Sequence, residues 1–238
     1  MKKIGIIAAM EEEIVSLKQI VIIKKIEFTA GISFYIGKWD ETDVILARCG
    51  IGKVNAAMCA QILCSTYSCG YIINTGVAGG LDNRLNIGDI VVSSEVCQHD
   101  FDTTAFGDAP GFISRLNKLF FKADEELIRI ALSAAKNLKS QLTIEIGRIA
   151  SGDQFISGKE RKEFIVSAFG ASCVEMEGAA IGHVCEQNGV PFIVIRAISD
   201  KADESAQEDF PVFAKKAAVT SAALVAEMLK EIQNVYYG

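Results

Sequence analysis

The stretch ASCVEMEGAAIGHVCEQNGVPFIVIRAISD, residues 171–200, decides the fold of this chain. It begins with a short apolar segment at 173–174, continues with small and apolar residues at helical spacing over 179–184, and ends in a nearly unbroken apolar run over 192–198. This order predicts a strand, a helix that packs closely on a sheet, and a strand covered on both faces. Gly189-Val190-Pro191 ends the helix. The stretch therefore indicates an α/β domain.

Three charged residues of this stretch are candidates for a polar site. Arg196 interrupts the apolar run, and a buried charge is too costly without a partner. Asp200 ends the same run, at the strand end where open α/β sheets bind ligands. Glu177 is expected to face the same pocket. Each carboxylate also has a purely structural alternative: Glu177 as a first-turn helix carboxylate, and Asp200 as a cap or turn residue.

Composition excludes several classes of protein. The 238 residues are 50% hydrophobic and 23% charged, with a net charge of −6 and no basic block. We therefore expect a globular protein with neither a nucleic acid nor a membrane as partner. Seven scattered cysteines without a CxxC pair, and only two histidines, predict free thiols, no metal site and no cofactor. The N-terminus does not read as a signal peptide, so we expect a cytoplasmic location.

The remaining elements follow from hydrophobic patterning along the chain. We expect one domain over residues 1–238, with an early meander of adjacent strands before the alternating strands and helices begin. The predicted strands cover residues 4–9, 21–28, 33–37, 43–48, 71–74, 88–96 and 143–150. The first predicted helix begins after residue 10. The other predicted helices cover residues 53–67, 124–138, 159–166 and 210–232.

Two glycine-rich segments invite phosphate-binding interpretations. In Cys49-Gly50-Ile51-Gly52-Lys53, the third glycine of a dinucleotide motif would fall at Asn55 and the distal glycine of a P-loop at Ala47, so both interpretations fail. The segment 75–80, TGVAGG, is predicted to form a turn after a short strand. Its glycines suit a backbone that approaches a ligand closely, although they are also compatible with a simple turn.

Several motifs in this order resemble the 5′-methylthioadenosine/S-adenosylhomocysteine nucleosidase family over nearly the whole chain. The motifs are MEEE at 10–13, GIGKVNAA at 50–57, INTGVAGG at 73–80, GDIVVSSE at 88–95, SGDQFI at 151–156, VEMEGAAIGHVC at 174–185 and RAISDKAD at 196–203. The resemblance implies a single-domain, three-layer α/β/α fold with a central mixed sheet, similar to nucleoside phosphorylases. It also implies a homodimer that binds a small-molecule nucleoside.

The resemblance implies hydrolysis of an N-glycosidic bond, with release of adenine and a 5-thio-substituted ribose. In this pattern Glu13 activates the attacking water, and Asp200 protonates the adenine leaving group. Glu177 binds the ribose hydroxyls. The other residues implied in substrate binding are Met10, Ala78, Gly79, Phe155 stacked on the base, Ile156 at the base edge, Met176 against the sugar, Arg196 and Ser199 positioning Asp200, Phe210 at the alkylthio end, and Phe106 reaching the partner's pocket.

These residue types suit the chemistry. Cleavage at the anomeric carbon builds oxocarbenium character, which carboxylates stabilise. Adenine leaves well only when protonated, and burial can raise an aspartate pKa enough to supply that proton. The chain departs from many family members at Val77, where they have serine, and over residues 108–121.

Three alternatives stay open. A purine nucleoside phosphorylase would use phosphate in place of water, with Arg48 as a possible ligand, although three glutamates in the first βα turn would repel an anion. A catalytically silent nucleoside-binding protein would need neither Glu13 nor Asp200. A hydrolase acting on another 6-amino purine nucleoside, such as aminodeoxyfutalosine, would share Glu177 and Asp200.

Overall fold

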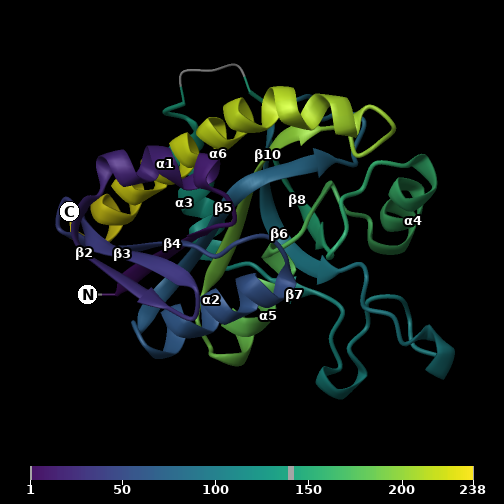
Figure 1. Cartoon of the computed structure of the whole chain (residues 1–238), viewed down its shortest axis with the longest axis horizontal. Helices are drawn as coiled ribbons and strands as arrows, with labels where there is room; N and C mark the ends of the chain where they lie inside the picture. Colours follow the sequence, from purple (N-terminus) through teal and green to yellow (C-terminus); the bar gives the residue numbers. More distant parts are fainter. Residues whose placement is uncertain (1, 139–141, 238) are drawn as a thin grey trace.

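The computed structural model describes residues 2–138 and 142–237. Ten strands and six α-helices make up this part of the chain, and Figure 1 shows how they are arranged. The strands are β1 (Lys3–Ala8), β2 (Ile22–Thr29), β3 (Ile32–Trp39), β4 (Thr42–Arg48), β5 (Cys69–Gly80), β6 (Ile90–Gln98), β7 (Phe121–Lys122), β8 (Ile144–Ser151), β9 (Cys173–Glu175) and β10 (Phe192–Asp200). The helices are α1 (Glu11–Ile20), α2 (Lys53–Ser65), α3 (Glu125–Ala135), α4 (Lys159–Phe169), α5 (Gly178–Gln187) and α6 (Ala206–Tyr237).

The sheet is mixed, and part of it closes on itself. Its strand order is β10-β6-β8-β9-β5-β1-β4-β3-β2, and β10 also pairs with β5. The five strands β10, β6, β8, β9 and β5 thus form a closed ring, from which the other strands extend as an open sheet. The long strand β5 pairs with three neighbours: parallel to β1 and β10, and antiparallel to β9. Closure removes the exposed edges that this part of the sheet would otherwise have.

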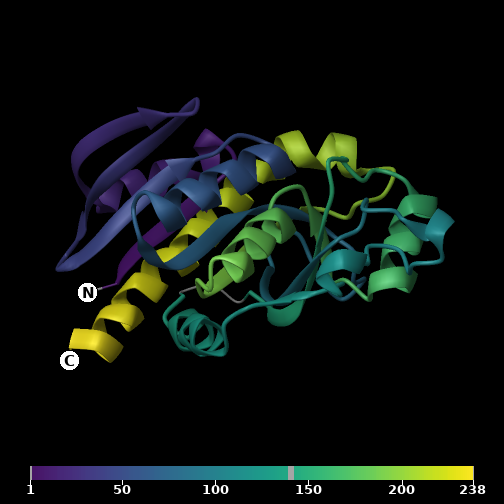
Figure 2. The ribbon, with the colours of Figure 1, turned by 90° about the horizontal axis from the view of Figure 1, so that it is seen from below.

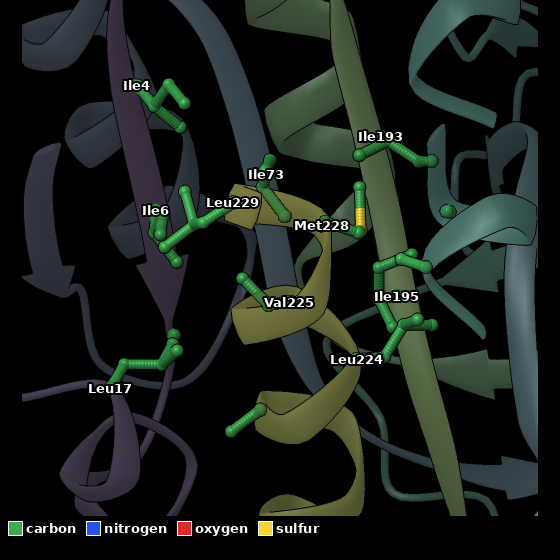
Figure 3. Close-up of a cluster of buried hydrophobic side chains, with 14 of the residues drawn as sticks. Ile4, Ile6, Leu17, Ile73, Ile193, Ile195, Leu224, Val225, Met228 and Leu229 are labelled. Carbon is green, nitrogen blue, oxygen red and sulfur yellow. The ribbon is translucent and has the colours of Figure 1, made fainter. Parts of the chain in front are cut away.

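Helices cover both faces of the sheet, as a three-layer fold requires. On one face α1, α3 and α6 pack over β1, β5 and β10, and on the other α2 and α5 pack together (Figures 1 and 2). Figure 3 shows how α6 contributes Leu224, Val225, Met228 and Leu229 to the first layer, against isoleucines of β1, β5 and β10. The predicted single-domain α/β/α fold with a mixed sheet is confirmed in its architecture.

Three sequence predictions about elements need correction. The segment 75–80 is the second half of β5, because pairing with β10 over 75–79 and with β9 at 79–80 holds it extended despite its glycines. Helix α5 begins at Gly178, after β9, so Glu177 is its N-cap residue. Helix α6 begins four residues before Phe210 and includes Pro211 as its sixth residue, where the missing N–H leaves one helical hydrogen bond unmade.

The segment between β6 and β7 protrudes from the body of the molecule (Figure 1). It contains two short 3₁₀ turns, Thr104–Phe106 and Ser114–Leu116. The apolar residues at the end of this segment are partly covered: Phe121 is fully buried, and Leu119 and Phe120 pack against a small cluster that includes Phe169 of α4. Across residues 2–138 and 142–237, no helix combines the length and apolar character needed to cross a bilayer.

Candidate active site

A cavity of about 350 Å³ lies at the carboxyl ends of β1, β5, β9 and β10. This is the position at which α/β sheets commonly bind ligands. Its wall is mostly apolar, with four carboxylates placed within it. The lining residues are Ala9, Met10, Glu13, Ile51, Val77, Ala78, Gly79, Phe155, Val174, Glu175, Met176, Glu177, Ser199, Asp200 and Phe210.

Glu13 is held by backbone N–H groups from two elements. As the third residue of α1, its Oε2 accepts hydrogen bonds from the N–H groups of Ala9 and Met10 at 2.8 and 2.9 Å. Its Oε1 accepts from Val77 N–H of β5 at 3.1 Å. Burial raises the pKa of Glu13, while the positive charge of Arg196 and these N–H groups oppose the rise. The result is a fixed, largely desolvated carboxyl group with a positive neighbour.

Asp200 sits at the end of β10 in different surroundings. Its Oδ2 accepts a hydrogen bond from the hydroxyl of Ser199 at 2.8 Å, and its Oδ1 accepts from Ala202 N–H at 2.9 Å. Burial raises the pKa of Asp200; the hydrogen bonds from Ala202 and Ser199 oppose the rise, and the negative charges of Asp209 and Asp203 add to it. The net effect of these surroundings favours the protonated form of Asp200.

Glu177 and Arg196 belong to one buried charge cluster. Arg196, only 1% exposed, forms an ion pair with Glu175 and donates to Asn74 Oδ1 at 2.7 Å. Its Nη2 lies 3.8 Å from Glu177 Oε2. Burial first, and then the charge of Glu175, raise the pKa of Glu177 to about 8. The single positive charge of Arg196 thus interacts with several carboxyl groups, those of Glu175, Glu177 and Glu13.

The glycines of β5 leave space for these carboxylates. A Cβ atom on Gly76 would lie 2.5 Å from Oε1 of Glu13, and one on Gly79 would lie 2.8 Å from Oδ1 of Asp200. Neither distance is tolerable for non-bonded atoms, so the backbone of β5 approaches the carboxylates as only glycine permits.

Comparisons with known proteins agree on one family. The sequence matches the phosphorylase superfamily over residues 3–230. It is 44% identical over 237 residues to a 5′-methylthioadenosine/S-adenosylhomocysteine nucleosidase of a Geobacillus species, covering 98% of this chain and 100% of the relative.

Two solved structures are similarly close to this fold. The nucleosidase of the same name from Neisseria meningitidis, in complex with methylthio-immucillin-A, superposes with a TM-score of 0.93 at 40% identity, covering 97% of this chain and 99% of that one. A Helicobacter pylori futalosine hydrolase gives a TM-score of 0.92 at 38% identity, covering 97% and 98%.

The chain belongs to the methylthioadenosine/S-adenosylhomocysteine nucleosidase family.

Most of the residues that the sequence assigned to a nucleosidase site are brought together in the cavity. Phe155 and Phe210 meet edge to face, with ring centroids 5.6 Å apart, and form an aromatic corner. Phe155 is about half exposed, which leaves its ring available to a ligand. The other predicted residues that line the cavity are Met10, Glu13, Ala78, Gly79, Met176, Glu177, Ser199 and Asp200.

Three predicted residues of the nucleosidase site lie elsewhere. Ile156 is buried beside the cavity and packs with Leu81 and Ala202. Phe106 is 87% exposed on the protruding segment and does not line the cavity of its own chain. Arg196 lies behind the cavity wall. Its hydrogen bonds and ion pairs in the described structure go to Asn74, Ile195, Glu175 and Glu177 and not directly to Asp200. That it positions Asp200 stays a prediction.

The sequence analysis missed Glu175. This residue accepts hydrogen bonds from the N–H groups of Glu177 and Gly178 and from the hydroxyl of Ser151, in addition to its pairing with Arg196. It therefore stabilises the N-terminus of α5, where a carboxylate is favoured. The signal was present: a buried arginine predicts a buried acid. Within the described residues no cluster of histidine, cysteine or carboxylate side chains is suited to a metal ion.

The raised pKa of Glu177 predicts how stability depends on pH. The unfolded chain releases this proton near pH 4.5, whereas the folded nucleosidase keeps it up to about pH 8. Folding stability should therefore fall as the pH rises from 5 to 8, and Glu177→Gln, which never ionises, should lose this part of the dependence. Urea unfolding of both proteins at pH 5 and 8 measures it, with Glu163→Gln, on the exposed side of α4, as control. Parallel pH profiles for wild type and Glu177→Gln would contradict the assignment.

Proposed function

We propose that this protein hydrolyses the N-glycosidic bond of 5′-methylthioadenosine and S-adenosylhomocysteine, releasing adenine and the 5-thio-substituted ribose. The observation that carries the proposal is a pair of buried carboxyl groups in one cavity with opposite electrostatic surroundings. Glu13 has Arg196 as its charged neighbour, and Asp200 has Asp203 and Asp209. Burial raises the pKa of both groups, but Arg196 favours the ionised form of Glu13, so the pair is suited to supply one base and one acid at the same pH.

Asp200 is the proposed general acid. Adenine is a poor leaving group until a ring nitrogen is protonated, so the acid must hold a proton when the substrate binds. The raised pKa of Asp200 favours that state, and the Ser199 hydroxyl and Ala202 N–H fix the direction of the carboxyl group. Asp200 would transfer its proton to the base as the bond to the anomeric carbon lengthens.

Glu13 is the proposed general base. Three backbone N–H groups hold its two oxygens, which limits rotation of the carboxylate and leaves one acceptor position, on Oε1, for a water molecule. Desolvation makes the ionised group a stronger base than a carboxylate in water. The water would lose its proton to Glu13 as it attacks the face of the ribose opposite the departing base.

The remaining residues would bind the two ends of the nucleoside. Glu177, with its Oε1 already fixed by Gly52 N–H at 2.8 Å, would accept hydrogen bonds from the ribose hydroxyls. Phe155 would stack on adenine, and the apolar wall formed by Met10, Ile51 and Phe210 suits a thioether substituent.

Phosphorolysis, the main alternative, finds little support in the cavity. An incoming phosphate dianion would enter a cavity lined by carboxyl groups and would meet the negative charge of those that are ionised. Arg48, the candidate phosphate ligand, is half exposed and lies 3.7 Å from Glu11, with which it pairs. Water, which carries no charge, is the nucleophile that fits.

Adenine release distinguishes these reactions. We expect release from methylthioadenosine and S-adenosylhomocysteine at the same rate with and without inorganic phosphate, with a free reducing sugar as co-product. A requirement for phosphate would move the assignment to a phosphorylase. Aminodeoxyfutalosine belongs in the same assay because the Helicobacter pylori relative is a futalosine hydrolase. Strong preference for that nucleoside would change the substrate while leaving the mechanism intact.

Isosteric substitutions test the two catalytic roles. Glu13→Gln and Asp200→Asn should each lower kcat by roughly 10²–10⁴-fold, the usual contribution of a positioned proton-transfer group. Asp203→Asn, which changes a neighbouring charge without touching the cavity, should reduce kcat far less. Circular dichroism and adenine binding verify that each variant is folded. Near-normal turnover in either isostere would remove that residue from the mechanism.

The protein is also proposed to act as a homodimer in which Phe106 enters the partner's cavity. The support is the 87% exposure of this large aromatic residue on a protruding segment, which a partner surface would cover. Light scattering at micromolar concentration should give twice the chain mass of 25.7 kDa. Phe106→Ala should raise KM more than it lowers kcat, and a monomer with full activity would refute this proposal.

A further inference from the structure

Two loops that border the cavity are joined by a hydrogen-bonded ring of three residues, Lys53, Asp100 and Asp153. None of the three belongs to the described lining of the cavity. The first loop is the turn 49–52 before α2, and the second is the irregular segment 152–158 between β8 and α4. Asp100 follows β6 and lies between them in the ring.

The ring closes through three hydrogen bonds. Lys53 Nζ donates to Asp100 Oδ1 at 2.6 Å, Asp153 N–H donates to Asp100 Oδ2 at 2.9 Å, and Lys53 N–H donates to Asp153 Oδ1 at 2.8 Å. Gln98 Oε1 accepts a further bond from Lys53 Nζ at 3.1 Å. Each of the three members therefore contacts both of the others.

Each loop carries a group that faces the nucleoside. Gly52, directly before Lys53, donates its N–H to Oε1 of Glu177, and Ile51 lines the cavity. Phe155 stands two residues after Asp153 and lines the cavity from the other loop. The ring thus connects the loop that holds Glu177, the proposed ribose-binding residue, to the loop that carries Phe155, the proposed base-stacking residue.

Burial and the helix terminus strengthen the ring. The side chains of Lys53 and Asp100 are only 18% and 14% exposed, so their ion pair is less screened than one on the open surface. Burial alone would raise the pKa of Asp100, but Lys53 and Asp153 N–H more than offset it, and the carboxylate stays ionised. Helix α2 begins at Lys53 with a glycine N-cap, so Asp153 supplies the capping oxygen from the second loop.

We propose that the ring of Lys53, Asp100 and Asp153 is a positioning device that holds Phe155 and the Gly52–Glu177 contact in fixed register and thereby sets the affinity for the nucleoside. The inference rests on the proposed function, because it treats Phe155 as the base end and Glu177 as the ribose end. Positioning residues of this kind act on binding without contacting the ligand, and a displacement of about 1 Å can cost up to a hundredfold in activity.

Calorimetric titration with adenine tests the base end without relying on turnover. Lys53→Met and Asp100→Asn should each weaken adenine binding by about tenfold. Lys53→Arg, which keeps the positive charge within reach of Asp100, should recover most of the lost affinity. Lys38→Met and Asp43→Asn form the matched controls: they break an exposed ion pair, 3.8 Å between Nζ and Oδ1, in the β3–β4 hairpin and should leave binding unchanged.

A double-mutant cycle separates positioning from a general loss of structure. In a Phe155→Ala background the aromatic side chain that would be positioned is absent. Asp100→Asn should therefore weaken adenine binding by clearly less than it does in the wild type. A purely structural role predicts the same factor in both backgrounds. Thermal unfolding of all variants identifies any that fail to fold, and Lys53→Arg serves as the folded comparison.

The outcomes for the two proposals are distinct. Wild-type protein that binds neither adenine nor methylthioadenosine would overturn the proposed function. Two results would overturn the positioning role alone, provided that the wild type binds adenine. One is an adenine affinity of Lys53→Met and Asp100→Asn equal to that of the wild type. The other is an equal loss of affinity on Asp100→Asn in the wild-type and Phe155→Ala backgrounds.

Discussion

The pairing of Arg196 with Glu175 is the interaction on which the site depends. Both side chains are almost fully buried, so removal of either would leave an uncompensated charge, a change that typically costs about 3–5 kcal/mol. Arg196 belongs to β10 and Glu175 to β9, and Asn74 ties the same guanidinium to β5. Because Glu175 also accepts from the N–H groups that begin α5, one ion pair fixes both the strand ends and the direction of Glu177.

The excess of carboxylates around this single guanidinium explains how similar side chains can perform different tasks. Glu13 and Glu177 compete for the field of Arg196, while Asp200 lies beyond it among other acidic residues. Protonation states are therefore distributed by position within the cavity. A nucleoside contributes hydroxyl groups and a basic ring nitrogen, which are the groups that such a mixture of ionised and neutral carboxyls can bind and protonate.

The sequence predicted the elements that periodicity governs and missed contacts that only tertiary structure creates. The apolar run ending at Asp200 was sufficient to predict β10, and the demand of Arg196 for a partner was correct. Its partner was not foreseen, because pairing between β9 and β10 residues depends on strand order, which no local pattern encodes. The segment 75–80 was predicted as a turn because glycine is rare in strands, whereas here the glycines make room for carboxylates.

The three-way pairing of β5 has a consequence for biosynthesis. Glu13 leaves the ribosome early, but the strand that carries Asp200 completes the closed ring only after nearly two hundred residues have been made. Until then β5 lacks its parallel neighbour β10, and Gly76 and Gly79 have no pairing partner on that side. Nascent chains generally fold from the N-terminus, and contacts between distant segments form slowly. The two proposed catalytic carboxyl groups therefore come together only late in synthesis, and until then one edge of β5 stays unpaired.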